Sequence, residues 1–142
     1  MPATYVLDNS VTMTWLFADE KREDCDALQL ELAGASTAIV PEHWSVEVAN
    51  ALVIGERRKR IVSSSLQPFI DVINSLQIEN DKASRRTVFS ETLALARQHG
   101  LTAYDAAYLE LALRLGAPLA SLDSSLRKVA QSLGVELFPI QI

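Results

Sequence analysis

The chain is poor in the residues that mark several classes of protein. Its 142 residues include one cysteine, two histidines, five glycines and five prolines. A single cysteine excludes an intramolecular disulfide and a cysteine-rich zinc site, and the shortage of glycine and proline argues against disorder. No apolar stretch approaches the roughly 20 residues of a membrane span, and the N-terminus lacks a signal peptide's basic leader. These absences predict a cytoplasmic protein that does not enter a membrane.

Positive charge is also scarce. Thirteen lysines and arginines stand against eighteen acids, which gives a formal net charge of −5. This balance argues against a basic surface that covers the whole protein, although a local one remains possible. Basic residues gather at 57–60 and at Arg85-Arg86. Both runs fit a solvated helix end, where cations suit the negative end of the helix dipole, and contact with phosphates is the alternative.

The hydrophobic pattern predicts strands that alternate with helices. Short apolar strands are expected at 4–7, 37–40, 76–79, 119–122 and 135–138. Helical spacing predicts helices at about 9–17, 21–33, 42–60, 64–75, 81–98, 103–115 and 124–133. Strands separated by helices require crossover connections, so we expect one α/β domain over 1–142. It should contain a mainly parallel sheet of about five short strands covered by about seven helices.

Four carboxylates stand where the predicted helices begin. Asp8 and Asp123 each follow an apolar strand, Glu47 lies in the first turns of the third helix, and Asp105 follows Thr102 at capping-box spacing. Each residue alone fits a structural role, either as a helix cap or as a negative charge near a helix N-terminus.

Taken together, the four acids indicate a metal site. In an open parallel sheet, ligands bind beyond the carboxyl ends of the strands, where the strand order reverses. If the strands before Asp8 and Asp123 are neighbours, these carboxylates lie only several ångströms apart. Two charges about 4 Å apart repel by roughly 4 kcal/mol at an effective dielectric constant near 20, and a bound cation removes that repulsion. Oxygen ligands without His or Cys favour Mg²⁺ or Mn²⁺ over zinc.

Other catalytic motifs are missing from the sequence. It contains neither of the glycine-rich phosphate loops and no GxSxG elbow. His43 and His99 are too few and too separated for a zinc site, and the place of His43 favours a role at the start of a helix. Cys25 is expected to be inert in the core. A phosphotransfer receiver domain would need a second acid after the first strand and a lysine after the last, and neither is present.

Around the four carboxylates the sequence resembles the PIN-domain ribonucleases, and specifically the VapC toxins of bacterial and archaeal toxin–antitoxin pairs. The resemblance covers essentially the full length. It rests on four segments in order, which are Val-Leu-Asp8-Asn-Ser10, Trp44-Ser-Val-Glu47-Val-Ala-Asn50, Leu-Thr102-Ala-Tyr-Asp105-Ala-Ala-Tyr-Leu and Ala-Ser121-Leu-Asp123. It implies a PIN-like fold and a metal-dependent endoribonuclease that hydrolyses phosphodiester bonds in single-stranded or loop RNA.

The resemblance also implies roles for particular residues. The acids of the catalytic metal site would be Asp8, Glu47, Asp105 and Asp123. Asp8 and Asp105 would bind Mg²⁺ or Mn²⁺ directly, and Glu47 and Asp123 would bind it directly or through water. The polar residues expected to support them are Ser10, Asn50 and Ser121.

A homodimer and a cognate antitoxin are further implications of the resemblance. The C-terminal segment of the antitoxin would cover the acidic cleft, and the cluster Trp15–Phe17 would form part of its groove, although core packing is the ordinary role of such a cluster. Two alternatives remain open. One is a PIN nuclease that processes RNA outside a toxin–antitoxin system, and the other is a non-catalytic RNA- or protein-binding module. A chain this short, with no further domain, favours the toxin.

Overall fold

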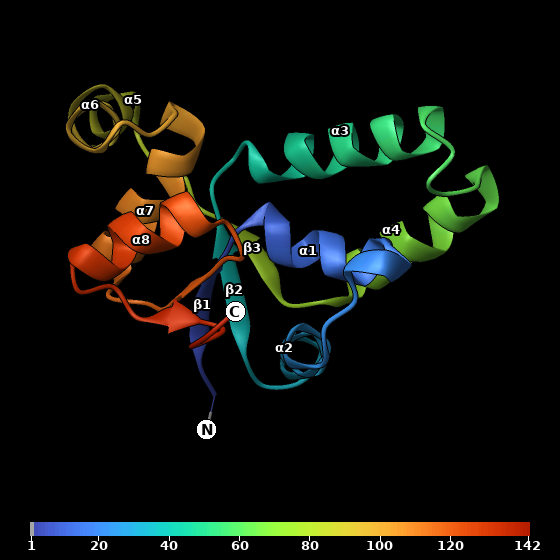
Figure 1. The fold of residues 1–142 in the computed structure, drawn as a ribbon. Coiled ribbons are helices and arrows are strands. Elements are labelled where there is room, and N and C mark those ends of the chain that lie inside the picture. Colours follow the sequence, from blue (N-terminus) through green and yellow to red (C-terminus); the bar gives the residue numbers. More distant parts are fainter. Residues whose placement is uncertain (1) are drawn as a thin grey trace.

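The computed structural model describes residues 2–142 and is built around a five-stranded parallel sheet (Figure 1). The strands are β1 (Thr4–Leu7), β2 (Thr37–Val40), β3 (Ile78–Asn80), β4 (Leu119–Ala120) and β5 (Leu137–Phe138). Their order is β3-β2-β1-β4-β5, and every neighbouring pair is parallel. The predicted sheet is therefore confirmed, with β3 at one edge.

Helices fill the connections between the strands. They are α1 (Asn9–Leu16), α2 (Glu23–Ala33), α3 (Trp44–Arg57), α4 (Leu66–Ser75), α5 (Arg85–Thr87), α6 (Leu93–His99), α7 (Ala103–Leu115) and α8 (Ser124–Ser132). A π-helical turn, Val88–Thr92, joins α5 to α6 in one continuous helix over 85–99. Counted in this way, residues 2–142 form the seven helices that the pattern predicts. Short 3₁₀ turns at Ala18–Glu20 and Ser63–Ser65 precede α2 and α4.

The strand order divides the helices between the two faces of the sheet. From β1 the chain moves outward through β2 to β3, and then crosses back to β4 and β5 on the other side of β1. Because such crossovers are right-handed, the reversal moves the helices to the opposite face. Figure 1 shows α1 to α4 on one side of the strands and α5 to α8 on the other. The reversal lies between β1 and β4, which is the expected ligand position in such sheets.

Burial on both faces explains why the central strands are short apolar runs. Val6 and Leu7 in β1, and Leu119 and Ala120 in β4, have no exposed surface. Side chains of a strand alternate between the two faces, so only a sheet covered on both sides buries consecutive residues. Within residues 2–142, no helix is long and apolar enough to cross a membrane.

The aromatic cluster at the end of α1 packs largely into the protein. Phe17 is 6% exposed, and the Arg60 guanidinium lies 3.7 Å from the centre of its ring. The indole Nε1 of Trp15 donates a hydrogen bond of 2.9 Å to the carbonyl of Cys25, which is buried as expected. Core packing therefore accounts for much of this cluster, and its part in an antitoxin groove stays a prediction.

Candidate active site

Asp8 is the most tightly held of the four predicted acids. Its backbone N–H donates to the carbonyl of Ala120 (2.9 Å), which fixes the end of β1 against β4. The hydroxyls of Ser10 and Ser121 both donate to its Oδ2, each at 2.7 Å. Sequence reasoning allowed Asp8 a role as the cap of α1, but its side chain makes no capping hydrogen bond. The carboxylate is instead held by two serines from opposite ends of the chain.

Burial makes Asp8 an unusual carboxylate. It is 6% exposed, and burial raises its pKa from 3.8 to about 6. The two serine hydroxyls act in the opposite direction because they stabilise the ionised form, while the charges of Asp105 and Glu47 raise the pKa further. The protein itself therefore stabilises the ionised form of Asp8 too little to offset the cost of burying its charge.

Two serines also organise the loop that carries Asp123. The hydroxyl of Ser10 accepts a hydrogen bond from the N–H of Leu122 (2.9 Å), and that of Ser121 accepts one from the N–H of Asp123 (3.1 Å). Asp123 itself is exposed and caps α8, because its Oδ1 accepts a hydrogen bond from the N–H of Leu126 (2.9 Å). Asp123 thus has the capping role that the sequence allows, and it stands beside the other acids as well.

Glu47 is held by residues that sequence reasoning did not assign to the site. The buried phenol of Tyr108 donates a hydrogen bond to its Oε1. His43, one helical turn earlier, brings its Nε2 within 3.3 Å of the same oxygen, although without the geometry of a hydrogen bond. His43 lies at the start of α3, as expected, and also faces the acids. The spacing of four residues between His43 and Glu47 was the sequence signal that both side chains share a helix face. Tyr108 lies one helical turn after Asp105, which gives a similar signal.

Asp105 completes the group from the first turn of α7. Its N–H donates to the hydroxyl of Thr102 (3.1 Å), which confirms half of the predicted capping box. Burial raises the pKa of its half-buried carboxyl, and the charges of Asp123 and Glu47 raise the pKa further, while His43 lowers it. Each of the four acids is therefore close enough to act electrostatically on at least one other.

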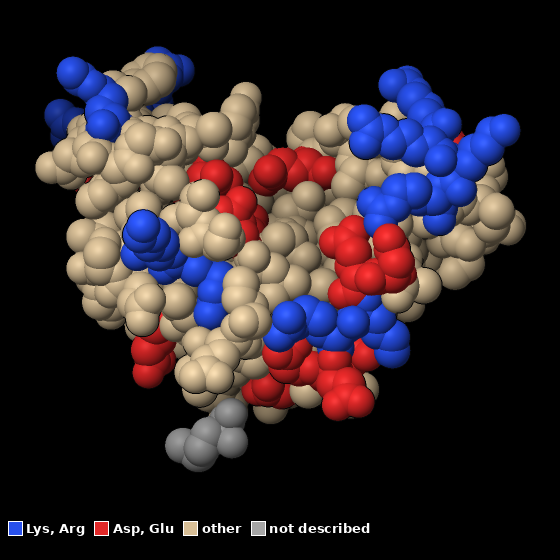
Figure 2. Space-filling model, in the orientation of Figure 1, with Lys and Arg blue, Asp and Glu red and all other residues tan. Residues whose placement is uncertain are grey.

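Apart from His43, the four acids face one another without a basic partner among residues 2–142. No lysine or arginine of residues 2–142 forms an ion pair with any of them. Figure 2 shows acidic surface within the hollow at the top of the molecule, beside the start of α3. Basic side chains instead cover the two outer shoulders of this hollow, over the helix 85–99 and over the end of α3. The structure thus leaves a concentration of negative charge at the switch point of the sheet.

The geometry limits how a metal ion can be held there. Across the described chain, no group of three or more His, Cys, Asp or Glu side chains is arranged to hold an ion between them. Mg²⁺ commonly uses one or two carboxylates and fills its remaining positions with water or substrate phosphate. Uncompensated carboxylates and all-oxygen donors fit such an ion, with some of the acids acting through water.

The predicted supporting residues have different outcomes. Ser10 and Ser121 contact the acids directly, as described above. Asn50 is exposed on α3 and has no side-chain hydrogen bond to another described residue, so its supporting role stays a prediction.

The residues of the basic run 57–60 differ in their contacts. Arg60 is engaged by Asp19 (2.9 Å) and Glu20 (3.0 Å), whereas Arg57 to Lys59 are exposed and have no ion pair within residues 2–142.

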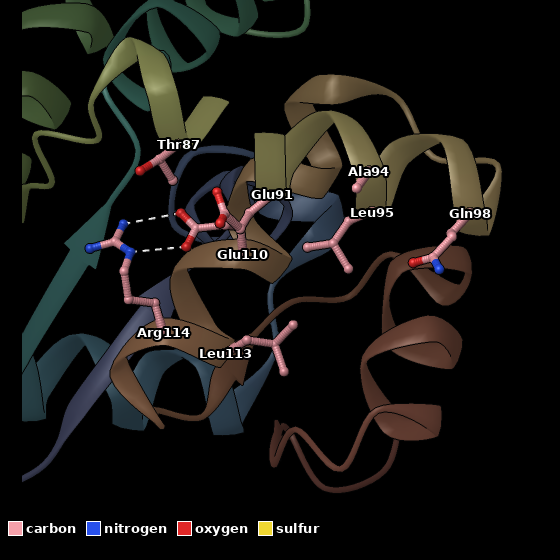
Figure 3. Close-up of a pocket in the computed structure, with 8 residues that line it drawn as sticks. All are labelled: Thr87, Glu91, Ala94, Leu95, Gln98, Glu110, Leu113 and Arg114. Atoms are coloured by element: carbon pink, nitrogen blue, oxygen red, sulfur yellow. Dashed lines mark hydrogen bonds and ion pairs between the residues drawn. The ribbon is translucent and has the colours of Figure 1, made fainter. Parts of the chain in front are cut away.

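A separate pocket of about 580 Å³ lies between the helix 85–99 and α7 (Figure 3). None of the four acids lines it. Arg114 binds Glu110 there (2.9 Å) and also binds Asp81 (2.6 Å), just beyond β3. This ion network ties the edge of the sheet to α7 and has a structural explanation.

Comparison with known proteins identifies the family. The sequence profile of the PIN domain matches residues 5–132, which is most of the chain. The protein therefore belongs to the PIN domain family. Its sequence is 36% identical over 84 residues to Ribonuclease VapC3 of Pyrobaculum aerophilum. That alignment covers 56% of this chain and 61% of the relative, so the chain spans less than two thirds of the relative's length.

Solved structures agree on the fold. The crystal structure of PAE2754 from Pyrobaculum aerophilum superposes with a TM-score of 0.68 at 22% identity, covering 98% of this chain and 93% of that one. VapBC2 from Rickettsia felis, bound to a DNA fragment from its promoter, gives a TM-score of 0.65 at 14% identity, covering 94% and 96%. At these identities, the likeness shows the fold alone.

Proposed function

We propose that this protein is a metal-dependent endoribonuclease, and that it is the toxin of a VapBC-like toxin–antitoxin pair. The observation that carries the proposal is the group of four coupled carboxylates at the switch point of the sheet, with Asp8 buried and clamped by two serines. Membership of the PIN family and the similarity to a relative named as a ribonuclease support it. We also propose that 1–142 forms a single PIN domain.

The four acids divide the work of binding a divalent ion. Asp8 and Asp105 bind it directly, while Glu47 and Asp123 act directly or through water. We expect Mg²⁺ or Mn²⁺, because both accept carboxylate oxygens readily. When bound, such an ion lowers the pKa of a water molecule and stabilises charge on a phosphate oxygen. The protein contributes by holding the Asp8 carboxylate in place through Ser10 and Ser121, and that of Glu47 through Tyr108, before the substrate arrives.

Hydrolysis requires water to attack phosphorus in line with the leaving 3′ oxygen. Helix N-termini favour the approach of the phosphate, because their free N–H groups carry partial positive charge. The starts of α3, α7 and α8 all stand beside the acids, since Glu47, Asp105 and Asp123 lie in or cap their first turns. Unpaired RNA suits this site because its backbone can enter the hollow and its bases are free.

The proposed partners follow from the same family. We propose a cognate antitoxin that covers the acidic hollow, and a homodimer of this chain in the cytoplasm. A toxin in this sense arrests growth when it is expressed alone. Co-expression of its antitoxin should restore growth and should abolish RNA cleavage by the purified complex.

The decisive test is cleavage of total cellular RNA by the purified protein. Reactions contain Mn²⁺, Mg²⁺ or EDTA, and new 5′ ends are mapped by sequencing. We expect cuts at a few sites with metal and none with EDTA. Asp8→Asn should remove them, while Asp71→Asn, an equal change at an exposed position on α4, should not. Cuts that persist in EDTA or with Asp8→Asn would overturn the proposed mechanism.

A further inference from the structure

An exposed aromatic ring stands next to the acids. Within residues 2–142, the two aromatic rings that are largely exposed are Tyr104, at 63%, and Phe89, at 68%. Tyr104 directly precedes Asp105 in the first turn of α7, whereas Phe89 lies in the π-helical turn, which carries none of the four acids. So exposed a ring adds little to the packing of the protein, which leaves its position beside the site to be explained.

Contacts with His43 fix where this ring stands. The rings of Tyr104 and His43 meet edge to face, with centroids 5.3 Å apart and an interplanar angle of 65°. His43 in turn meets the buried ring of Tyr108 in the same way at 5.2 Å. The exposed ring is therefore attached, through His43, to the residues that hold Glu47. An edge-to-face contact occupies at most one flat face of either ring, so at least one face of the exposed Tyr104 ring is left for another partner.

We propose that Tyr104 is a platform on which an unpaired base of the RNA stacks, beside the phosphate that is cleaved. This inference rests on the proposed function and adds to it a means of choosing the substrate. Any base has a flat face, so aromatic side chains bind single strands with little regard to sequence. In a duplex both faces of each base are already stacked on neighbours, and the platform would find no partner. The site therefore selects unpaired nucleotides by contact as well as by access.

The charge around the hollow supports a nucleic acid on this surface. Arg57, Arg58 and Lys59 are exposed at the far end of α3. Arg57 lies ten positions after Glu47, which is about 15 Å along a helix that rises 1.5 Å per residue. Lys59 has a positive φ of 59°, which turns the chain and ends the helix at this cluster. The flanking phosphates of a single-stranded RNA bound at the acids can therefore reach these cations. Figure 2 shows this basic shoulder beside the hollow.

Binding and cleavage of one RNA by matched variants test the proposal. The probe is a fluorescein-labelled, unstructured 12-nucleotide RNA that contains a cleavage site mapped in total RNA. Affinity is measured by anisotropy in EDTA, and kcat and KM with Mn²⁺. We expect Tyr104→Ala to weaken binding about tenfold, and Tyr104→Phe to bind like the wild type because the ring remains. Phe89→Ala removes an equally exposed ring and should have no effect. Thermal melting should be unchanged in all three variants.

Abasic substitutions locate the base that stacks. A series of the same RNA, each lacking one base, should contain one position at which the loss of affinity equals that of Tyr104→Ala. Combining that RNA with that variant should cost no more than either change alone, because both remove the same contact. Losses that add at every position would overturn the proposal, as would equal losses for Phe89→Ala.

Other outcomes separate this inference from the function on which it rests. A wild type that cleaves RNA while Tyr104→Ala binds and cleaves equally well would refute the platform and leave the nuclease intact. If Tyr104→Ala lost only its affinity for the antitoxin, the ring would belong to a protein interface and the proposal would be wrong. A wild type that neither binds nor cleaves RNA would refute both.

Discussion

Neutralising Asp8 should make the metal-free protein more stable. Burial raises the pKa of this carboxyl from 3.8 to about 6, so at neutral pH the folded protein carries a charge that its surroundings disfavour. A difference of this size corresponds to about 3 kcal/mol at 1.36 kcal/mol for each pH unit. Asp8→Asn removes the charge and keeps an oxygen that accepts from Ser10 and Ser121. Because the new amide needs hydrogen-bond acceptors of its own, we expect a net gain of about 2 kcal/mol.

The gain should depend on pH in a defined direction. Between about pH 4 and pH 6, the folded protein binds a proton at Asp8 that the unfolded chain has released. The contribution of Asp8 to the free energy of unfolding therefore falls as the pH rises through this window. Well below pH 4 both states are protonated and only the cost of the amide remains, so Asp8→Asn should be about 1 kcal/mol less stable than the wild type. At pH 7.5 the full difference should be present.

Urea unfolding at pH 4 and pH 7.5, with EDTA, measures this difference directly. The exposed Asp71→Asn serves as the control and should change little at either pH. Adding Mn²⁺ at 100 times its dissociation constant should then stabilise the wild type by about 2.7 kcal/mol and leave Asp8→Asn unchanged. An Asp8→Asn protein that is less stable than the wild type in EDTA at pH 7.5, or whose gain is the same at pH 4, would refute this reasoning.

Three further substitutions test contacts around and behind the site. Tyr108→Phe removes the phenol that holds Glu47, so calorimetry should show metal affinity reduced about tenfold with the fold retained, and unchanged affinity would exclude this role. Gly55→Ala should lower the free energy of unfolding by about 1 kcal/mol, because a new methyl would lie 3.0 Å from the Phe17 ring and the packing cost exceeds the gain in helix propensity. Replacing the buried Arg127 with methionine should cost about 2 kcal/mol in urea unfolding, since two backbone carbonyls lose a charged donor, and a neutral result would show that they find other partners.

Much of the fold follows from local signals in the chain. Apolar runs predict strands at 4–7 and 37–40 that the structure reproduces residue for residue. Gly100 and Gly116 adopt left-handed conformations, with φ of 65° and 62°, and end α6 and α7 where the sequence predicts. Such features depend on neighbouring residues only. The sequence alone therefore predicts the order of elements, and from that order the parallel sheet.

The sequence also predicts that the four acids lie close together. Asp8 and Asp123 follow strands that the prediction treats as possible neighbours, and β1 and β4 do pair. A parallel sheet brings the carboxyl ends of its strands to one edge, so residues 115 positions apart meet without any detail of packing. Recognition of four short motifs in order then added Glu47 and Asp105.

Only the tertiary structure decided how these acids are held. The hydroxyl of Ser121 reaches Asp8, the phenol of Tyr108 reaches Glu47, and Arg60 turns away from its basic neighbours to bind Asp19. Each contact joins residues at least 41 positions apart. Its existence depends on how far a helix is rotated about its axis and on which rotamer the core permits. Periodicity in the sequence predicts that a helix exists and which face is apolar, but a rotation of a few tens of degrees decides which polar groups meet.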